Sequence, residues 1–379
     1  MNRRILFLSS ASWSFIWQRH HELASHFAKN HRVLFIENIG SHRKIKLKDV
    51  NRIWERLKNI LFSRASQPVN KPQNIVLIKW FLLPETNSIF DTINARILMK
   101  YLKTEFPSKV DAIYYNIPTK VNYQLLQKYP DALRIYDNMF NPTAFGKMES
   151  EYAETEIMAL SVTDLVIVNT TISFSHYTKI HQNVQYLPEA VRLDRFFLKH
   201  QQINRKENCL LYFGHISRFH FDQELIRGTA VRHPDWKIVL VGPVKDKYTF
   251  PKNVETIGQV QHQELIRYIE KANVLCMPYR KNDVMKGVFP AKTFECLATG
   301  LPTVVINVPE LEKDYSDVFY IAHSNEEFIT LCETAMDEND LKLRELRQKK
   351  ANANTWEIRC QQFDAILEDA MLQKRGVRA

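Results

Sequence analysis

Residues 289–300 read FPAKTFECLATG, and the argument for the fold starts from this stretch. It holds no helix breaker between Pro290 and Gly300, so it predicts a loop running into a helix, with Pro290 in the first helical turn. The free amides of a helix start, joined by Lys292, favour a bound anion such as phosphate. Glu295 lies about one turn further in, where a carboxylate accepts hydrogen bonds from sugar or ribose hydroxyls. An ordinary surface helix is the alternative interpretation.

The length and composition indicate two domains. A chain of 379 residues is long enough for two cores of ordinary size. No stretch of about 18 apolar residues occurs, which predicts a cytoplasmic protein. The five cysteines form no CxxC pair, so we expect buried, reduced thiols rather than a metal knuckle or a disulfide framework.

The formal net charge of +10 is concentrated in one segment, residues 41–72, which holds nine basic residues against two acidic ones. Apolar residues at helical spacing over 49–62 indicate a cationic amphipathic helix. Such a helix predicts contact of residues 43–64 with an anionic membrane surface, on the inner face of the plasma membrane. Packing of the apolar stripe on the first domain is the alternative. The chain has no helix-turn-helix, zinc-finger or RRM signature, so no nucleic-acid partner is expected.

Two series of apolar runs alternate with helical patterns, and each series predicts a parallel α/β sheet. The first series is 5–8, 33–36, 75–78, 112–115, 133–136, 165–168 and 184–187. The second series is 210–213, 238–241, 254–257, 274–277, 303–306 and 319–321. We therefore expect an α/β protein of two Rossmann-like doubly wound domains, 1–195 and 208–353, with a ligand-binding cleft between them. Residues 195–207 form the predicted linker, and residues 354–379 a C-terminal helix.

Glycines gather where the second sheet would bind a ligand. Six of the nine glycines fall between residues 214 and 300, and three of these follow predicted strands. Glycine permits sharp turns and close approach of the backbone to a ligand. The candidate binding residues at these strand ends are Gly214, His215, Gly242, Gly258, Gln259 and Val260. Tighter turns alone are the alternative explanation. The chain contains neither GxGxxG nor GxxxxGK[ST], so neither a dinucleotide-binding fingerprint nor a P-loop is predicted.

The order and spacing of these segments resemble GT-B glycosyltransferases of the retaining family 4, in the bacterial surface-polysaccharide branch that includes teichuronic-acid-type transferases. The matching segments of the second domain are YFGHISRFHFDQELI (212–226), KIVLVGPV (237–244), ETIGQVQHQELIRYIEKANVLCMPY (255–279) and FPAKTFECLATGLPTVV (289–305). The first domain agrees more loosely, through IWQRHHELASHFA (16–28), RIYDNMF (134–140), DLVIVNT (164–170) and YLPEAVRLDRF (186–196).

The resemblance implies transfer of a sugar from a nucleoside diphosphate of the UDP, GDP or dTDP type to a hydroxyl of a glycan or lipid-linked acceptor, with no bound metal. It places Glu295 on the ribose and residues 258–260 beside the base. It also implies that Lys292 and the backbone of the turn formed by Phe289, Pro290, Ala291 and Lys292 hold the diphosphate and the donor sugar. Proline has no amide N–H, so the backbone of Pro290 can only shape this turn.

Arg218 is the candidate second phosphate cation, because a guanidinium suits phosphate; a solvated loop arginine is the alternative. One departure from the family pattern concerns the first glutamate of its Glu-x7-Glu motif. That position is Gly287 here, so the usual contact to the sugar is absent or comes from elsewhere, for example from Asp283.

In the first domain, small polar residues stand where the family usually has a glycine-rich turn. Ser10 lies in this turn, and the helix that follows opens with Gln18, Arg19 and His20, which we expect on the acceptor side of the cleft. Asp137 follows a predicted strand and is the candidate group to orient the acceptor hydroxyl or accept its proton. A turn or cap role for Asp137 and a structural role for His20 are the alternatives.

The resemblance thus implies a hexosyltransferase that retains anomeric configuration. Lys292, Arg218 and the helix-start amides would stabilise the departing diphosphate. Two other interpretations stay open. One is a GT-B sugar-nucleotide epimerase, and the other is a non-catalytic relative that binds glycan or membrane.

Overall fold

The structure is a computed structural model, and it describes residues 2–14, 17–37, 71–79, 88–106, 109–139, 149–198, 207–244, 246–282, 285 and 287–376. The chain forms two compact units. Unit 1 comprises residues 1–168, 174–186 and 363–379, and unit 2 comprises residues 169–173 and 187–362. The predicted segment 43–64 and the candidate residue Asp283 lie outside the described residues.

Unit 1 is built on a seven-stranded parallel sheet with the order β3-β2-β1-β4-β5-β6-β7. Its strands are Arg4–Leu8 (β1), Arg32–Glu37 (β2), Ile75–Lys79 (β3), Ala112–Tyr115 (β4), Leu133–Asn138 (β5), Leu165–Val168 (β6) and Val184–Tyr186 (β7). The order reverses between β1 and β4, which gives unit 1 the doubly wound switch point.

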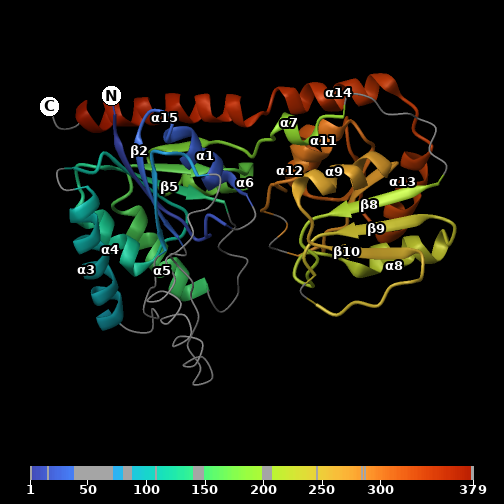
Figure 1. Cartoon of the computed structure of the whole chain (residues 1–379), viewed down its shortest axis with the longest axis horizontal. Helices are drawn as coiled ribbons and strands as arrows, with labels where there is room; N and C mark the ends of the chain where they lie inside the picture. Colours follow the sequence, from blue (N-terminus) through green and yellow to red (C-terminus); the bar gives the residue numbers. More distant parts are fainter. Residues whose placement is uncertain are drawn as a thin grey trace. The chain divides into compact units, whose positions relative to one another are not determined.

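Helices cover both faces of this sheet (Figure 1). They are Arg19–Phe27 (α1), Ser88–Glu105 (α3), Lys120–Lys128 (α4), Glu149–Leu160 (α5) and Thr171–Tyr177 (α6). On one face, α3, α4 and α5 pack over buried residues such as Leu6 and Ile113. On the other face, the ring of Phe27 in α1 lies between Phe7 (centroids 5.9 Å apart) and Phe363 (5.3 Å). Alternate residues of one strand thus feed two separate layers of core.

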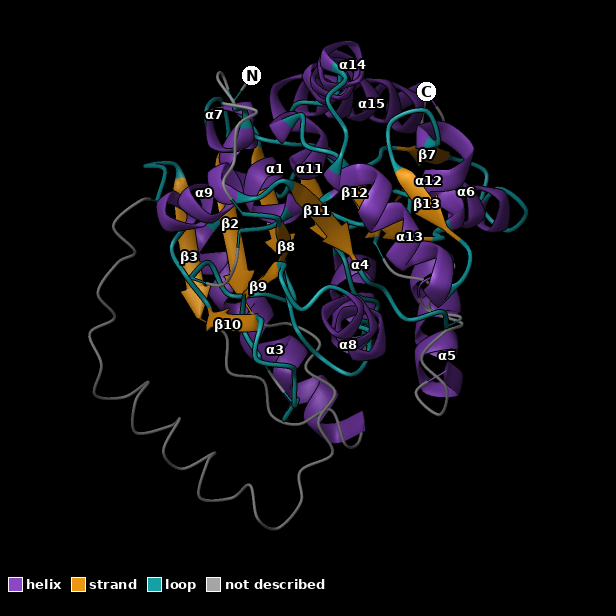
Figure 2. Cartoon of the chain, turned by 90° about the vertical axis from the view of Figure 1, so that its right-hand side faces the viewer, coloured by secondary structure: helices purple, strands orange, loops and turns teal. Residues whose placement is uncertain are grey.

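Unit 2 repeats the same plan with a six-stranded parallel sheet in the order β10-β9-β8-β11-β12-β13 (Figure 2). Its strands are Cys209–Phe213 (β8), Lys237–Val241 (β9), Val254–Gly258 (β10), Val274–Met277 (β11), Thr303–Ile306 (β12) and Tyr320–Ala322 (β13). The order of the strands reverses between β8 and β11, and this is the edge where open α/β sheets bind ligands.

The helices that lie wholly or partly in unit 2 include two packed groups. They are Leu193–Phe196 (α7), Gln223–Arg232 (α8), His262–Lys271 (α9), Thr293–Thr299 (α11), Pro309–Tyr315 (α12), Asn325–Met336 (α13), Leu341–Asn352 (α14) and Trp356–Gly376 (α15). Helices α8 and α13 pack against each other, while α11 contacts α7 and α14. The last helix, α15, begins in unit 2 and continues into unit 1 from Phe363.

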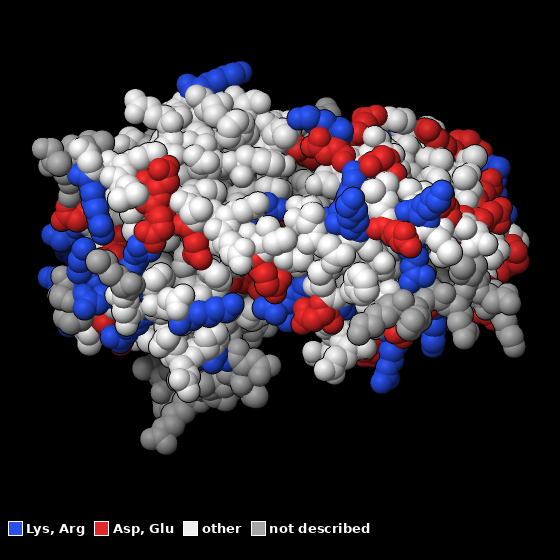
Figure 3. Space-filling model, turned by 90° about the horizontal axis from the view of Figure 1, so that it is seen from above, with Lys and Arg blue, Asp and Glu red and all other residues white. Residues whose placement is uncertain are grey.

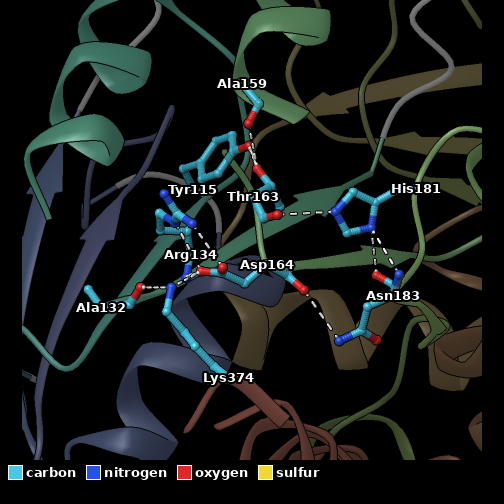
Figure 4. A network of polar contacts seen from close by, with 9 residues as sticks. All are labelled: Tyr115, Ala132, Arg134, Ala159, Thr163, Asp164, His181, Asn183 and Lys374. Carbon is cyan, nitrogen blue, oxygen red and sulfur yellow. Dashed lines mark hydrogen bonds and ion pairs between the residues drawn. The ribbon is translucent and has the colours of Figure 1, made fainter. Parts of the chain in front are cut away.

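The end of α15 is tied to unit 1 by a polar network (Figure 4). The carboxylate of Asp164 accepts hydrogen bonds from Arg134 through the backbone N (2.8 Å), Nε (2.9 Å) and Nη2 (2.9 Å). The Nζ of Lys374 in α15 donates a hydrogen bond to the Asp164 carboxylate at 2.5 Å and another to the carbonyl of Ala132. Burial alone would raise the pKa of Asp164, but the hydrogen bonds from Arg134 and Lys374 outweigh it and lower the pKa.

All thirteen strands predicted from the apolar runs are present in the structure. The helix expected from residue 291 begins at Thr293 instead, with Lys292 as N-cap, so the placement of Pro290 in the first turn is wrong. The carbonyl of Pro290 accepts hydrogen bonds from the N (2.9 Å) and Oγ1 (2.7 Å) of Thr293, and this turn delays the helix. The domain boundaries at 195, 208 and 354 stay predictions.

None of the described helices is both long and apolar enough to span a bilayer. On the face of the molecule drawn in Figure 3, basic and acidic side chains are interspersed and do not form one large patch of either sign.

Candidate functional site

The glycines that follow β8 and β9 bring two backbone segments into contact at the switch-point edge of unit 2. Gly214 has φ +137° and Gly242 has φ +144°, values that side chains rarely allow. The N–H of Gly214 donates to the carbonyl of Val241 (2.8 Å), and the N–H of Gly242 donates to that of Gly258 (2.7 Å). A Cβ added to Gly242 would overlap the carbonyl oxygen of Gly214. The two glycines therefore allow the backbone segments that follow β8 and β9 to lie in direct contact.

Lys292 places its ammonium at this switch point. Its Nζ donates to the carbonyl of Phe213, the last residue of β8, at 2.7 Å. The same atom lies 4.3 Å from the ring centroid of Tyr212 and 5.6 Å from that of Tyr279. A Cβ added to Gly214 would overlap Nζ. A half-buried cation thus stands where the ends of β8 and β11 meet.

The turn that carries Lys292 also has backbone amides without an acceptor. Among the described residues, nothing accepts a hydrogen bond from the backbone N–H of Ala291, Lys292, Phe294 or Glu295. Four donors on one turn, next to an ammonium, match the demands of a phosphate group. The arrangement can therefore hold an anion, although the helix behind it is only seven residues long.

Glu295 is half-buried on α11, and no described residue contributes a hydrogen bond to its carboxylate. Burial raises the pKa of Glu295 to about 7, and the nearby Glu189 adds to that rise, while Lys292 and Arg195 lower it. An unpaired carboxylate of this kind can accept hydrogen bonds from hydroxyl groups. Glu189 and Arg195, which the sequence analysis did not single out, are therefore neighbours of the candidate site.

Arg218 lies in the loop after β8 and pairs with Asp246. Its Nε contacts Asp246 Oδ1 at 2.7 Å and its backbone N donates to Oδ2 at 2.6 Å. The side chain of Arg218 is 80% exposed. Its carbonyl accepts a hydrogen bond from Arg280, which follows β11. Arg218 therefore belongs to the loops at the carboxyl ends of the strands, but its guanidinium is already engaged by a carboxylate.

The other candidates in unit 2 contribute mainly backbone or surface. Phe289 is buried with its ring 5.5 Å from that of Phe294, so only its main chain can face a ligand. The carbonyl of His215 accepts from Tyr212 Oη (2.9 Å). Gln259 is exposed after β10, and Val260 packs against the core.

In unit 1, Arg19 and Asp137 form a buried ion pair. Arg19 Nε lies 2.7 Å from Asp137 Oδ2, and both side chains are at most 1% exposed. The hydroxyl of Tyr114 donates to the same oxygen. No described residue donates a hydrogen bond to Asp137 Oδ1, which is buried. The roles of Asp137 in acceptor orientation or proton transfer stay predictions, since the structure shows this carboxylate holding the start of α1.

The remaining acceptor-side candidates also lie near the start of α1 and the end of β1. His20 is fully buried, and burial lowers its pKa well below the usual value, helped by His21 and Arg19. Gln18 is the exposed N-cap of α1, and its backbone N donates to His21 Nδ1 at 3.0 Å. Ser10 bonds Asn116 through its backbone N (3.2 Å) and its hydroxyl (2.9 Å), across the switch point of unit 1. His20 is thus buried in the structure, and its role on the acceptor side stays a prediction.

No group of three His, Cys, Asp or Glu side chains arranged to bind a metal occurs in the described parts of the chain.

The part of the chain that carries this site is similar to known proteins. Residues 215–337 match the family described as "Glycosyl transferases group 1". These residues carry the loops after β8 to β11, Lys292 and Glu295. The chain is also similar to TuaH of Bacillus subtilis (strain 168), whose name assigns it to teichuronic acid biosynthesis as a glycosyltransferase. The identity is 30% over 166 residues, which is 41% of either chain, so less than half of TuaH is covered.

Solved structures show the same fold over nearly the whole chain. Sucrose-phosphate synthase from Thermosynechococcus elongatus matches with a TM-score of 0.73 and 14% identity, covering 98% of this chain and 100% of the other. Anabaena HepE in complex with UDP-glucose matches with a TM-score of 0.67 and 12% identity, covering 97% and 99%. The fold is that of the GT-B glycosyltransferases, with two parallel Rossmann-like sheets.

Proposed function

We propose that this protein is a glycosyltransferase that moves a sugar from a nucleoside-diphosphate sugar to a hydroxyl of a glycan or lipid-linked acceptor in bacterial surface-polysaccharide synthesis. The observation that carries the proposal is the position of Lys292. Its ammonium lies at the switch point of unit 2, and the turn that carries it has four amides with no acceptor among the described residues, inside the segment that matches the glycosyl transferases group 1. A diphosphate leaving group needs such a concentration of positive charge and donors.

UDP is the nucleotide that we propose, because HepE, which shares the fold, was solved with UDP and with UDP-glucose. In this proposal the ammonium of Lys292 and the amides of Ala291 and Lys292 bind the diphosphate. The carboxylate of Glu295 accepts hydrogen bonds from the ribose. Residues 258–260 lie beside the base.

Three finer points extend the proposal. Transfer of a hexose with retention of anomeric configuration follows from the family resemblance, and the similarity to TuaH supports a cell-envelope glycan as the product. Lys292 and the amides supply the charge that the departing diphosphate requires, so the proposal includes no metal. A cytoplasmic site of action, peripheral to the membrane through residues 43–64, agrees with the cellular supply of nucleotide sugars.

Thermal stabilisation by a panel of UDP, GDP and dTDP tests the donor site. A ligand at 100 times its Kd adds about 2.7 kcal/mol to the free energy of unfolding. We expect UDP to raise the melting temperature of the wild type clearly more than that of Lys292→Met. Lys252→Met is the matched control, because Lys252 is an exposed lysine of unit 2 with no ion pair to any described residue. The proposed donor site is wrong if no nucleotide stabilises the wild type, or if the control loses the shift as well.

Product analysis separates transfer from the alternatives. With UDP-glucose and a lipid-linked saccharide acceptor, a transferase releases UDP and extends the acceptor. An epimerase changes the nucleotide sugar without any acceptor. A non-catalytic relative does neither.

A further inference from the structure

The ammonium of Lys292 is enclosed by aromatic rings that no part of the proposed function has used. The rings of Tyr212, Tyr279 and Phe213 have their centroids 4.3, 5.6 and 5.8 Å from Nζ. All three residues are at most 6% exposed. Nζ donates a 2.7 Å hydrogen bond to the Phe213 carbonyl, and the hydroxyl of Tyr279 also interacts with it. The three rings and the Phe213 carbonyl together fix the position of the Lys292 ammonium.

The geometry is that of cation–π interactions, in which an ammonium lies within about 6 Å of a ring centroid. Such contacts strengthen when water is excluded, and here the rings are buried in the core of unit 2. Tyr212 belongs to β8 and Tyr279 follows β11, so the two rings flank the switch point. The absence of a side chain at Gly214 leaves room for the end of the Lys292 side chain, since Lys292 Cε would lie 3.1 Å from a Cβ at that position.

The two hydroxyl groups have other partners. Tyr212 Oη donates to the His215 carbonyl at 2.9 Å, and Tyr279 Oη lies 3.8 Å from Met277 Sδ. Burial raises the pKa of both hydroxyls, so they stay protonated and neutral. Tyr212 therefore presents the face of its ring to Lys292, whereas Tyr279 contacts Lys292 through its ring and through its hydroxyl.

We propose that Tyr212 and Tyr279 are positioning residues that hold the Lys292 ammonium at the switch point, where it meets the diphosphate of the donor. This inference rests on the proposed function and adds to it two residues that touch Lys292. A lysine side chain has four rotatable bonds, and fixing its ammonium before the ligand arrives removes an ordering cost from binding. Loss of a ring should therefore weaken binding of the diphosphate through Lys292 alone.

A double-mutant cycle on UDP affinity, measured by calorimetry, tests this coupling. We expect Tyr212→Leu to weaken UDP binding about tenfold, the size of a desolvated cation–π contact. Tyr212→Phe keeps the ring and should bind UDP within about twofold of the wild type. In the Lys292→Met background, Tyr212→Leu should cause no further loss. Equal losses in both backgrounds would show that the ring only packs, and would overturn the inference.

A second measurement needs neither nucleotide nor a destabilised variant. In protein labelled with ¹³C at lysine Cε, the Lys292 resonance should be shifted upfield by the ring current of Tyr212, while that of Lys252 should be unshifted. Lys292→Met assigns the signal. An unshifted Lys292 resonance in the wild type would overturn the inference directly.

The two measurements also separate this inference from the proposed function. If UDP, GDP and dTDP all fail to bind the wild type, the proposed function fails, and the positioning role fails with it. If UDP binds but the cycle is additive or the resonance is unshifted, only the positioning role is lost.

Discussion

Gly242 lies directly against Gly214 at the ends of β9 and β8, and a Cβ on Gly242 would overlap the Gly214 carbonyl oxygen. Gly242 also has φ +144°, which strains any side chain. We expect Gly242→Ala to lower the free energy of unfolding by about 3 kcal/mol, since strain and overlap add. Urea denaturation measures this change.

Gly258→Ala is the matched control for that substitution. Gly258 has φ +83°, but a Cβ there would meet no atom within 4 Å. Only the backbone strain remains, and we expect a loss of about 1 kcal/mol. Equal losses at the two positions would show that the contact between Gly242 and Gly214 is unimportant.

Asp164 should make the free energy of unfolding of unit 1 fall at acidic pH. Its side chain is 19% exposed and pairs with Arg134 and Lys374. Because its folded pKa is lowered, its contribution is complete above the unfolded pKa of about 3.9 and is lost as the pH falls through the lower folded pKa. Asp164→Asn should cost about 2 kcal/mol at pH 7.

Urea denaturation from pH 7 to pH 3 tests the contribution of Asp164. The difference between wild type and Asp164→Asn should be constant above about pH 5 and shrink below about pH 4. Glu154→Gln, which neutralises an exposed carboxylate on α5, should change stability little at either pH. A constant difference down to pH 3 would show that the ionised carboxylate of Asp164 is not what stabilises the fold.

Most of the strands could be predicted from sequence because they are runs of apolar residues buried on both faces of a parallel sheet. For example, every residue of β6, Leu165–Val168, is buried. Helix boundaries were harder, since they depend on local hydrogen bonds. The turn at Pro290 delays α11, and no apolar pattern reports such a turn.

The candidate site was only partly predictable for a similar reason. Lys292 and the strand-end glycines follow from motif and position. The aromatic enclosure of Lys292 depends on which strands become neighbours in space. The burial of Arg19 and Asp137 likewise depends on contacts between residues 118 positions apart in the chain.

Chelators should leave the reaction intact if Lys292 and the amides carry the charge of the leaving group. We expect the rate of sugar transfer to be the same, within about twofold, before and after exhaustive dialysis against EDTA. Lys292→Met should reduce that rate by a factor of about 100 or more, the usual cost of removing one such stabilising group. A rate that falls on chelation and recovers on adding Mg²⁺ or Mn²⁺ would instead place a metal in the transition state.

Glu295 should make the stability of unit 2 fall as the pH rises towards neutral. Burial raises its folded pKa to about 7, whereas an unfolded glutamate titrates near 4.3. The folded state therefore holds the proton more tightly. The stabilising contribution of protonated Glu295 is complete below about pH 4.3 and is lost as the pH rises through 7. Glu295→Gln stays neutral at every pH. Its free energy of unfolding, relative to that of the wild type, should therefore increase by about 2 kcal/mol as the pH rises from 4.5 to 8, a value that allows for solvent screening of a half-buried group.

Urea denaturation of both proteins across that range measures the difference. Glu264→Gln is the control, because Glu264 is an exposed glutamate of the same unit with no ion pair to a described residue. A difference between wild type and Glu295→Gln that does not change with pH would mean that Glu295 is already ionised in the folded protein. The carboxylate would then have a partner for its charge other than the ribose hydroxyls that we assign to it.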